Sequence, residues 1–341
     1  MDILITCKAG YEKILAREIS LYHFRSQTQG HGWALAQEKD PASSQPSAMP
    51  LPDLCFACHI LEDPLNVRAA SVNSFVEKLT DLFIGHIRQR QITGPWPFLF
   101  TASGDERLTA HAGTAQERWL EKLSKKMSRV AKLAKEGLPH GEKFNEGFFV
   151  HVTDFNQAFV AFRAFSRGQQ RMKMDPLAPS RSYLKIEEAF HIFGREPREG
   201  ETVVDLGAAP GGWSHSALKR GASVTAVDNG PLKGAVASHS RLRHLKEDAL
   251  KYRYEGAGPV DWLFCDVLEK PDLILKVLHT WLSQRWCRCF VVNLKVGRLD
   301  PITVLKEVRD PGKGLLRYCK VLHTRQLYHD REEITLMGET K

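Results

Sequence analysis

Long apolar runs are missing from the sequence. No uncharged apolar stretch reaches the ~18 residues that a membrane-spanning helix needs. Only Ile3–Ile5 precede Lys8, which is too short for the apolar part of a signal peptide. The seven cysteines are an odd number, and in a chain without a signal peptide they are expected to be reduced thiols. These absences lead us to expect a soluble, cytoplasmic protein.

A strong metal-binding pattern is also missing. Cys55-x-x-Cys58 and Cys287-x-Cys289 lie far apart in the chain, and neither has a second ligand pair at the usual zinc-site spacing. We therefore expect no metal site.

Length and composition indicate an ordinary globular protein of more than one domain. The chain has 341 residues, whereas single cores usually stop growing at ~250–300. Apolar residues make up 43% and charged residues 26%, which excludes a disordered chain and a collagen-like repeat. We expect a small α+β domain over 1–50, a second domain with a linker over 51–175, and a third over 176–341.

Basic residues outnumber acidic ones by 48 to 40, which weakly favours a polyanionic partner. Between Arg118 and Lys135 there are seven basic residues and a single acid, Glu121. A helix over this segment would carry on one side what we call the basic face: Arg118, Lys122, Lys125, Arg129 and Lys132. This helix is either an ordinary solvated surface helix or a contact for RNA phosphates, which would position an RNA without identifying its sequence.

After residue 180, short apolar strands alternate with helical segments. The helices are expected over 182–193 and 273–286, and the strands over 202–206, 223–228, 242–245, 262–266 and 289–295. This alternation predicts an α/β fold with a doubly wound, mostly parallel, Rossmann-like sheet, in which ligands bind at the carboxyl ends of the strands.

A glycine-rich turn follows the first of these strands, in Asp205-Leu-Gly-Ala-Ala-Pro-Gly-Gly-Trp213. Gly207 allows a tight turn, and Gly211 with Gly212 would let the backbone approach a ligand closely, although a packing turn can use the same residues. Asp228 ends the second strand, where such folds place an acid on ribose hydroxyls. Asp248 follows the third strand and could accept a hydrogen bond from an adenine amino group.

The charge of this turn favours S-adenosylmethionine over a nicotinamide dinucleotide as the cofactor. The dinucleotide pattern G-x-G-x-x-G is absent, and Asp205 would repel a pyrophosphate. The same carboxylate suits the cationic amino end of S-adenosylmethionine, directly or through water. We therefore expect S-adenosylmethionine as cofactor and regard a nicotinamide-dependent oxidoreductase as a distant alternative.

Two further strand ends carry charged residues, Asp266 and Lys295. A lysine at the end of an apolar parallel strand is unusual because burying an ammonium group is costly. It is either a surface lysine whose stem lies along the apolar core, or a group that accepts a proton from a weakly acidic hydroxyl with Asp266 as its partner. Covalent attack by Cys265 is not expected, because the Pro-Cys setting of RNA cytosine-5 methyltransferases is absent. The Asp/Asn-Pro-Pro-aromatic motif of amino-group methyltransferases is absent as well.

Taken together, these motifs resemble the FtsJ-type ribose 2′-O-methyltransferases, especially the bacterial enzymes that methylate a cytidine ribose in 23S ribosomal RNA. The resemblance covers 178–336 densely and the first half only thinly. It is carried by Ser180-Arg-Ser-Tyr-Leu-Lys185, the glycine-rich turn, Cys265-Asp266, Asn293-Leu-Lys295 and Arg325-Gln-Leu-Tyr-His-Asp-Arg-Glu-Glu333.

The resemblance implies the roles of several residues. The catalytic group would be Lys185, Asp266, Lys295 and Glu333, with Glu332 as the other choice for the glutamate and Lys295 as the general base. The cofactor would contact Ser182, Asp205, Gly207, Ala209, Pro210, Gly211, Gly212, Trp213, Asp228, Asp248 and Asp266. It further implies that 51–175 is a THUMP-like RNA-binding domain, and that the partner is 23S ribosomal RNA before subunit assembly is complete. A monomer is favoured.

Two other functions remain open. The same chemistry could act on transfer RNA, or the chain could be a non-catalytic RNA-binding assembly factor that keeps the fold. The two lysines and the intact turn argue against the second, since an abandoned site need not keep them.

Overall fold

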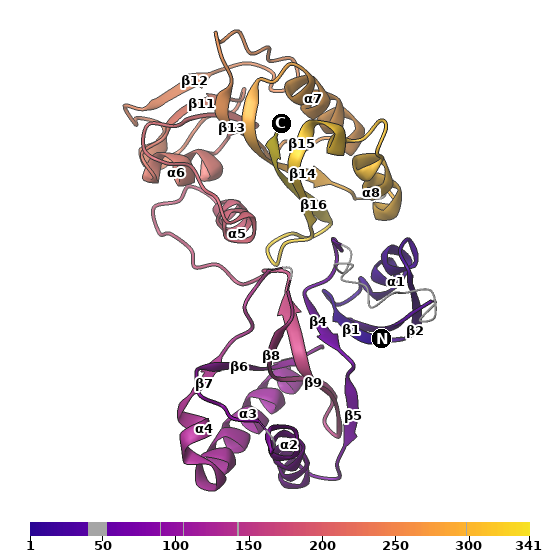
Figure 1. Ribbon diagram of the computed structural model, residues 1–341. Coiled ribbons are helices and arrows are strands. Elements are labelled where there is room, and N and C mark those ends of the chain that lie inside the picture. The colour runs from indigo at the N-terminus through magenta and orange to yellow at the C-terminus, as the bar shows by residue number, and fades with distance from the viewer. Residues whose placement is uncertain (40–52, 89, 105, 142, 298) are drawn as a thin grey trace. The chain divides into compact units, whose positions relative to one another are not determined.

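The computed structural model describes residues 1–39, 53–88, 90–104, 106–141, 143–297 and 299–341. It divides into two compact units, residues 1–168 and 169–341 (Figure 1). Residues 40–52, which are rich in proline and serine and which the sequence predicts to be a loop, lie outside the described residues. No helix in the described ranges is both long and apolar enough to span a membrane.

The first unit is a mixed sheet with helices against it. Its elements are β1 (Asp2–Thr6), α1 (Glu12–Ser20), β2 (Phe24–Gly30), β3 (Trp33–Glu38), β4 (His59–Glu62), β5 (Leu65–Arg68), α2 (Val72–Ile87), β6 (Trp96–Ala102), α3 (Glu106–Lys126), α4 (Ser128–Lys132), β7 (Ala134–Glu136), β8 (Asn145–Asp154) and β9 (Gln157–Ser166).

One sheet runs through this unit, in the order β2-β3-β1-β4-β9-β8-β6-β7, with β5 also paired to β9. The strand β1 pairs with both β3 and β4, so strands from before and after residue 50 belong to the same sheet. The helices α2 and α3 supply Phe83 and Trp119 to a core that includes Phe148 of β8. The division at residue 50 and the THUMP-like assignment stay predictions.

The prediction of a single helix over the basic segment 118–135 is wrong. The helix α3 ends at Lys126, and the short helix α4 begins at Ser128. Between them Met127 has φ −145° and ψ 64°, which is not helical. The basic face is therefore shared between two helices.

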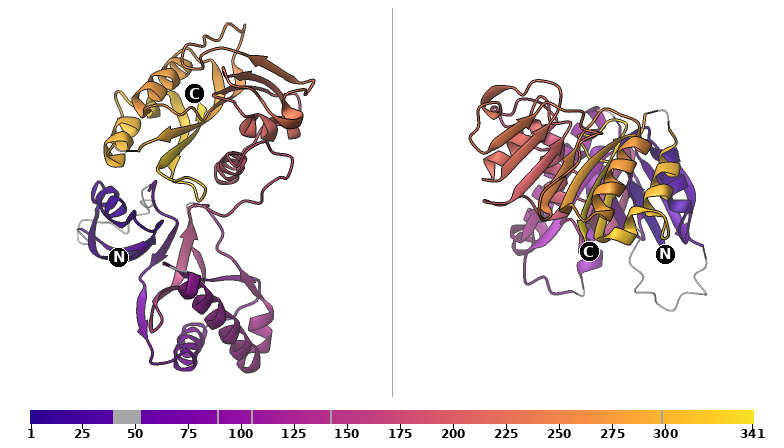
Figure 2. Two further views of the ribbon diagram at one scale, coloured as in Figure 1. Left: turned by 180° about the vertical axis from the view of Figure 1, so that it is seen from behind. Right: turned by 90° about the horizontal axis from the view of Figure 1, so that it is seen from above.

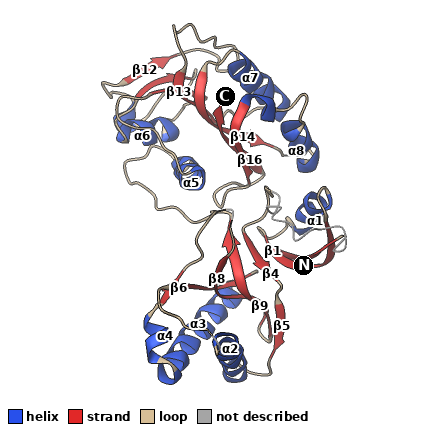
Figure 3. Ribbon diagram, in the orientation of Figure 1, coloured by secondary structure: helices blue, strands red, loops and turns tan. Residues whose placement is uncertain are grey.

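The second unit contains α5 (Tyr183–Phe193), β10 (Thr202–Leu206), α6 (Gly212–Lys219), β11 (Ser223–Val227), β12 (Leu242–Leu245), β13 (Val260–Cys265), α7 (Pro271–Ser283), β14 (Cys287–Lys295), α8 (Pro301–Arg309), β15 (Cys319–Arg325) and β16 (Glu333–Thr340). Figure 3 shows helices on both sides of the strands of this unit.

Its sheet has the order β12-β11-β10-β13-β14-β16-β15. The pairs from β12 to β14 are parallel, and β16 runs antiparallel between β14 and β15. The helices α5 and α6 cover one face, where Phe190 and Ala217 pack with Val203 and Phe264. The helices α7 and α8 lie on the other face (Figures 1 and 2). The expected doubly wound, mostly parallel fold is confirmed.

The strand register gathers the chemically interesting positions at one edge of the sheet. Leu206 is aligned with Val227 and with Cys265, the last residues of β11 and β13. Asp228 and Asp266 therefore follow their strands beside the glycine-rich turn. The antiparallel register then sets Lys295, the last residue of β14, opposite Glu333, the first residue of β16. This is the carboxyl-end edge, where ligands of such sheets bind.

Candidate active site

The glycine-rich turn forms one wall of a cavity of about 170 Å³. Gly207 has φ +75°, and a Cβ there would lie 2.6 Å from Cγ2 of Val267, so only glycine fits without strain. The cavity is lined by Ser180, Ser182, Asp205, Gly207, Ala208, Ala209, Pro210, Trp213 and Asp266. Seven of the residues predicted to hold the cofactor are therefore brought together here. Gly211 and Gly212 complete the turn, with Gly212 as the first residue of α6.

Asp205 lines this cavity although its side chain is almost fully buried. Its carboxylate accepts a hydrogen bond of 2.6 Å from the hydroxyl of Ser214. Burial raises the pKa of Asp205 to about 7, and the nearby charges of Asp266 and Asp228 act in the same direction. A cation bound in the cavity would stabilise the charged form of this carboxylate.

Asp228 holds the turn from the neighbouring strand. Its carboxylate accepts hydrogen bonds from the backbone N–H groups of Ala209 at 2.9 Å and Gly230 at 2.7 Å. Each carboxylate oxygen keeps a further lone pair that could accept from a ribose hydroxyl. Asp248 lies at the end of the next strand, where it accepts from the N–H of Leu250 at 3.0 Å, and its side chain is 43% exposed. Neither of these aspartates lines the 170 Å³ cavity itself.

The four predicted catalytic residues form one ionic cluster. The ammonium group of Lys185, on α5, donates to Glu333 at 2.8 Å. The ammonium group of Lys295 lies 3.5 Å from the same glutamate and forms an ion pair with Asp266. All four side chains are between 13% and 18% exposed. Glu332, by contrast, is an exposed residue outside these contacts.

The environment of Lys185 and Glu333 favours the charged form of both side chains. Burial lowers the pKa of Lys185, but the charges of Asp330, Asp266 and Glu333 outweigh this effect and leave the pKa above its usual value. Burial likewise raises the pKa of Glu333, while the bond from Lys185 brings it below its usual value. Lys185 and Glu333 therefore stay charged, which suits hydrogen bonding and orientation rather than proton transfer.

Three residues of the site were not anticipated from the sequence. The amide of Asn293, on β14, donates to Asp266 at 3.1 Å and steadies it beside Lys295. Asp330 is buried, and its Oδ1 lies 3.7 Å from Nζ of Lys185. Burial raises the pKa of Asp330 to about 6. Glu188, on α5, is buried and accepts backbone N–H bonds from Tyr328 at 2.7 Å and His329 at 3.2 Å. Asn293 and Asp330 lie inside motifs that carried the family resemblance, whereas nothing local in the sequence marked Glu188.

Burial raises the pKa of the Cys265 thiol to about 12, so this thiol is not an available nucleophile near neutral pH. Within the described ranges, no three His, Cys, Asp or Glu side chains are grouped so that they could hold a metal ion.

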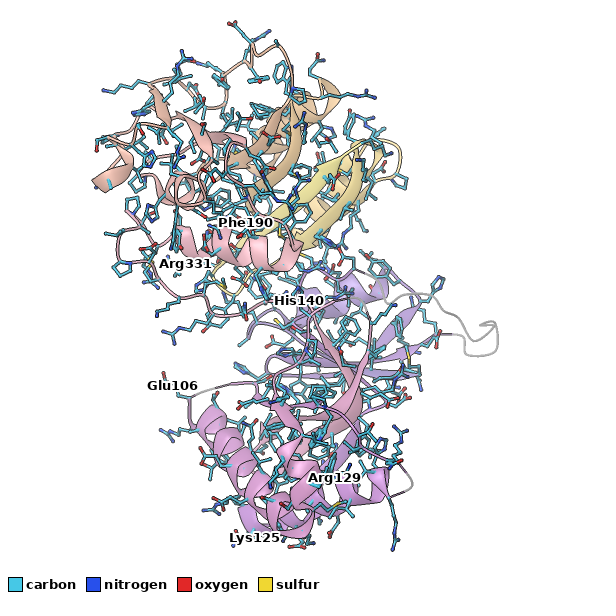
Figure 4. All side chains as sticks on the ribbon, turned by 60° about the vertical axis from the view of Figure 1, so that its left-hand side comes forward. Glu106, Lys125, Arg129, His140, Phe190 and Arg331 are labelled. Carbon is cyan, nitrogen blue, oxygen red and sulfur yellow. The ribbon has the colours of Figure 1, made fainter. Side chains whose placement is uncertain are left out.

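The basic face belongs to the first unit and is partly paired with α2. Lys122 forms an ion pair with Glu77, and Arg118 donates to the amide oxygen of Asn73 at 3.2 Å. Lys125 and Arg129 are exposed on α3 and α4 (Figure 4). The basic segment itself has few acids, but α2 supplies partners for two of its basic side chains. A role in RNA binding stays a prediction.

Comparison with known proteins identifies the family. The pattern of the FtsJ-like methyltransferase family matches residues 178–326. Ribosomal RNA large subunit methyltransferase M of Halorhodospira halophila is 31% identical over 341 residues, covering 98% of this chain and 95% of that protein. The chain belongs to the family of ribosomal RNA large subunit methyltransferase M.

A second relative is more similar over a shorter stretch. The enzyme of the same name from Laribacter hongkongensis is 40% identical over 178 residues, about half of each chain. Membership makes the chain a methyltransferase that uses S-adenosylmethionine, as expected from Asp205 and the glycine-rich turn. The resemblance to FtsJ-type enzymes drawn from the sequence is confirmed.

Among solved structures, a predicted N6-adenine-specific DNA methylase from Listeria monocytogenes aligns with 99% of this chain and 95% of its own, at 10% identity and a TM-score of 0.36. A likeness this weak carries no argument about function.

Proposed function

We propose that this protein transfers a methyl group from S-adenosylmethionine to the 2′-oxygen of a ribose in large-subunit ribosomal RNA. One observation carries the proposal. Two lysines and two carboxylates form a single ionic cluster, and one of them, Asp266, also lines the cavity beside the glycine-rich turn. A group that can deprotonate a hydroxyl thus lies next to the place for a methyl donor.

The turn conformation and the charge of this cavity support S-adenosylmethionine as its ligand. The positive φ of Gly207 lets the backbone turn tightly under a ligand, and the buried carboxylate of Asp205 favours a cationic amino group. Asp228 and Asp248, at the next two strand ends, would accept from the ribose and the adenine. When bound, the cofactor supplies an electrophilic methyl group on a positively charged sulfur.

The residues of the cluster would divide the remaining work. Lys295 first loses its ammonium proton to solvent water and then accepts the proton of the 2′-hydroxyl. Asp266 with Asn293 holds the amino group of Lys295 in position. Lys185 and Glu333, which stay charged, hydrogen-bond the ribose. Because the methyl donor is intrinsically reactive, positioning and proton removal are the main contributions that the protein must make.

The substrate assignment rests on the family. Relatives named for large-subunit ribosomal RNA match nearly the whole chain, which supports this RNA over transfer RNA. We further propose that the target is a cytidine, methylated before subunit assembly is complete.

Nucleoside mass spectrometry of ribosomal RNA, from cells with and without this protein, tests the proposal. One 2′-O-methylcytidine should disappear from the large-subunit RNA and return when the gene is restored. Loss of a methyl group from transfer RNA instead would favour the alternative substrate. Unchanged ribosomal and transfer RNA would refute the proposal.

A further inference from the structure

A second cavity, of about 300 Å³, lies on the other side of the lysine cluster. It is lined by Arg181, Ser182, Leu184, Lys185, His329, Arg331 and Glu333. Ser182 lines both cavities, so the two are adjacent. A molecule in the second cavity would therefore contact Lys185 and Glu333 while facing a methyl donor in the first.

The lining of this second cavity suits an anion. Three of its side chains, Arg181, Lys185 and Arg331, are cationic, and Glu333 is the single acid among them. Arg181 and Arg331 are both exposed at the mouth of the cavity, and Figure 4 labels Arg331. A guanidinium group offers planar, paired N–H donors that match the oxygens of a phosphate.

An aromatic pair lies beside this cavity, since His329 is one of its lining residues and Tyr328 precedes His329 in the chain. The ring centroids of Tyr328 and His329 are 5.1 Å apart at 75°, and Tyr328 is 53% exposed. The imidazole of His329 is fixed because its Nε2 accepts a hydrogen bond of 2.8 Å from the N–H of Met172.

The backbone under this pair is held by Glu188. Its buried carboxylate accepts the N–H groups of Tyr328, His329 and Gln170. An exposed aromatic ring on a backbone fixed in this way is preorganised for stacking rather than for packing inside the protein.

The depth of the cluster limits which RNA can reach it. Lys185, Lys295 and Glu333 are at most 18% exposed. The 2′-hydroxyls of a double helix lie along a wide, shallow minor groove, whose surface cannot enter a cavity. A single nucleotide turned out of its strand can.

We propose that the second cavity binds an unpaired, extruded RNA nucleotide, with Arg181 and Arg331 on the phosphates that flank its ribose and Tyr328 stacked on a base. This inference rests on the proposed function, and it adds the class of acceptor and the residues that hold it.

The first test is steady-state methylation of large-subunit ribosomal RNA from cells that lack the protein. Tyr328→Ala should raise KM for the RNA roughly five- to a hundredfold, the usual effect of removing an aromatic ring that stacks on a base. Tyr328→Trp should restore it. Arg181→Gln and Arg331→Gln should each raise KM. Each should also make the slope of log affinity against log salt concentration shallower by about 0.7.

The matched control is Arg241→Gln, an exposed arginine that immediately precedes β12, at the end of the strand away from the site. Its KM should equal that of the wild type. Affinity for S-adenosylmethionine should be unchanged in every variant, which also shows that each one folds.

A second test addresses the unpaired state directly. Once mass spectrometry has located the methylated nucleotide, a complementary DNA strand annealed across it should lower the rate at least tenfold. A strand annealed elsewhere on the RNA should not.

The outcomes separate the two proposals. Wild-type kinetics in Tyr328→Ala, Arg181→Gln and Arg331→Gln, or undiminished methylation of the paired nucleotide, would overturn this inference and leave the proposed function standing. Absence of RNA methylation by the wild-type protein would remove the proposed function, and this inference with it.

Discussion

Substitution of Lys295 distinguishes two possible roles of this residue, a proton acceptor and a fixed positive charge. The ammonium group of Lys295 contacts Asp266 and Glu333, both carboxylates. Arginine can keep these ion pairs, but it cannot lose its proton at working pH. Methionine removes both the charge and the base. Lys295→Arg and Lys295→Met should therefore be equally inactive if proton transfer is the role of this residue.

The expected loss follows from the chemistry assigned to Lys295. A positioned general base contributes about 10²–10⁴ in rate, which corresponds to about 2.7–5.5 kcal/mol of transition-state stabilisation. Affinity for S-adenosylmethionine should change less than about threefold, because Lys295 does not line the 170 Å³ cofactor cavity. The mutant enzymes should thus lose kcat and keep cofactor binding.

Single-turnover transfer of a labelled methyl group to ribosomal RNA measures the rate, and calorimetry measures cofactor affinity. Lys276→Arg, at an exposed position on α7, is the matched control and should keep the wild-type rate. If Lys295→Arg retained more than about a tenth of the wild-type rate, Lys295 could not be the base, and only an electrostatic role would remain.

Four further outcomes are expected. Asp228→Ala should weaken S-adenosylmethionine binding by roughly ten- to a hundredfold in calorimetry, because hydrogen bonds to a charged group are worth about 1.5–3 kcal/mol; unchanged affinity would count against its place on the ribose. Burial raises the pKa of Asp205 to about 7 and a cationic ligand favours the charged carboxylate, so binding below pH 7 should release a proton and affinity should rise between pH 6 and 7.5. A flat profile in the wild type would contradict this, and Asp205→Asn should abolish the rise. Residues 169–341, a compact unit, should fold alone and bind S-adenosylmethionine, as circular dichroism and calorimetry would report. Glutamine at all five positions of the basic face should lower RNA affinity and its salt slope without affecting the cofactor, and an unchanged slope would mean that this face does not touch RNA.

The fold of the second unit was largely predictable because its signals are local. Each parallel strand of the second unit is a short apolar run, and the residue that follows it is often the one that carries charge, as at Asp228 and Asp266. Parallel strands bring such positions to one edge whatever the details of packing. The bounds expected for the five strands β10 to β14 differ from the observed ones by at most two residues, and β15 was not foreseen.

What could not be predicted depends on contacts between distant segments. The break at Met127 and the pairing of Lys122 with Glu77 of α2 are set by how the helices pack, so a helical wheel drawn for 118–135 could not show them. Glu188 was equally hidden, because a glutamate in the middle of an amphipathic helix usually faces water. Here it is buried to hold a loop that lies 140 residues further along the chain.

The position of β16 has a consequence for the order in which the molecule is assembled. This strand is synthesised after β14 and β15, yet it lies between them in the sheet. Glu333 opens β16, so the ionic cluster lacks a member until β16 has inserted, whereas the glycine-rich turn and the strands β10 to β13 are made much earlier. A nascent chain therefore contains every element of the cofactor turn before it contains the complete catalytic group.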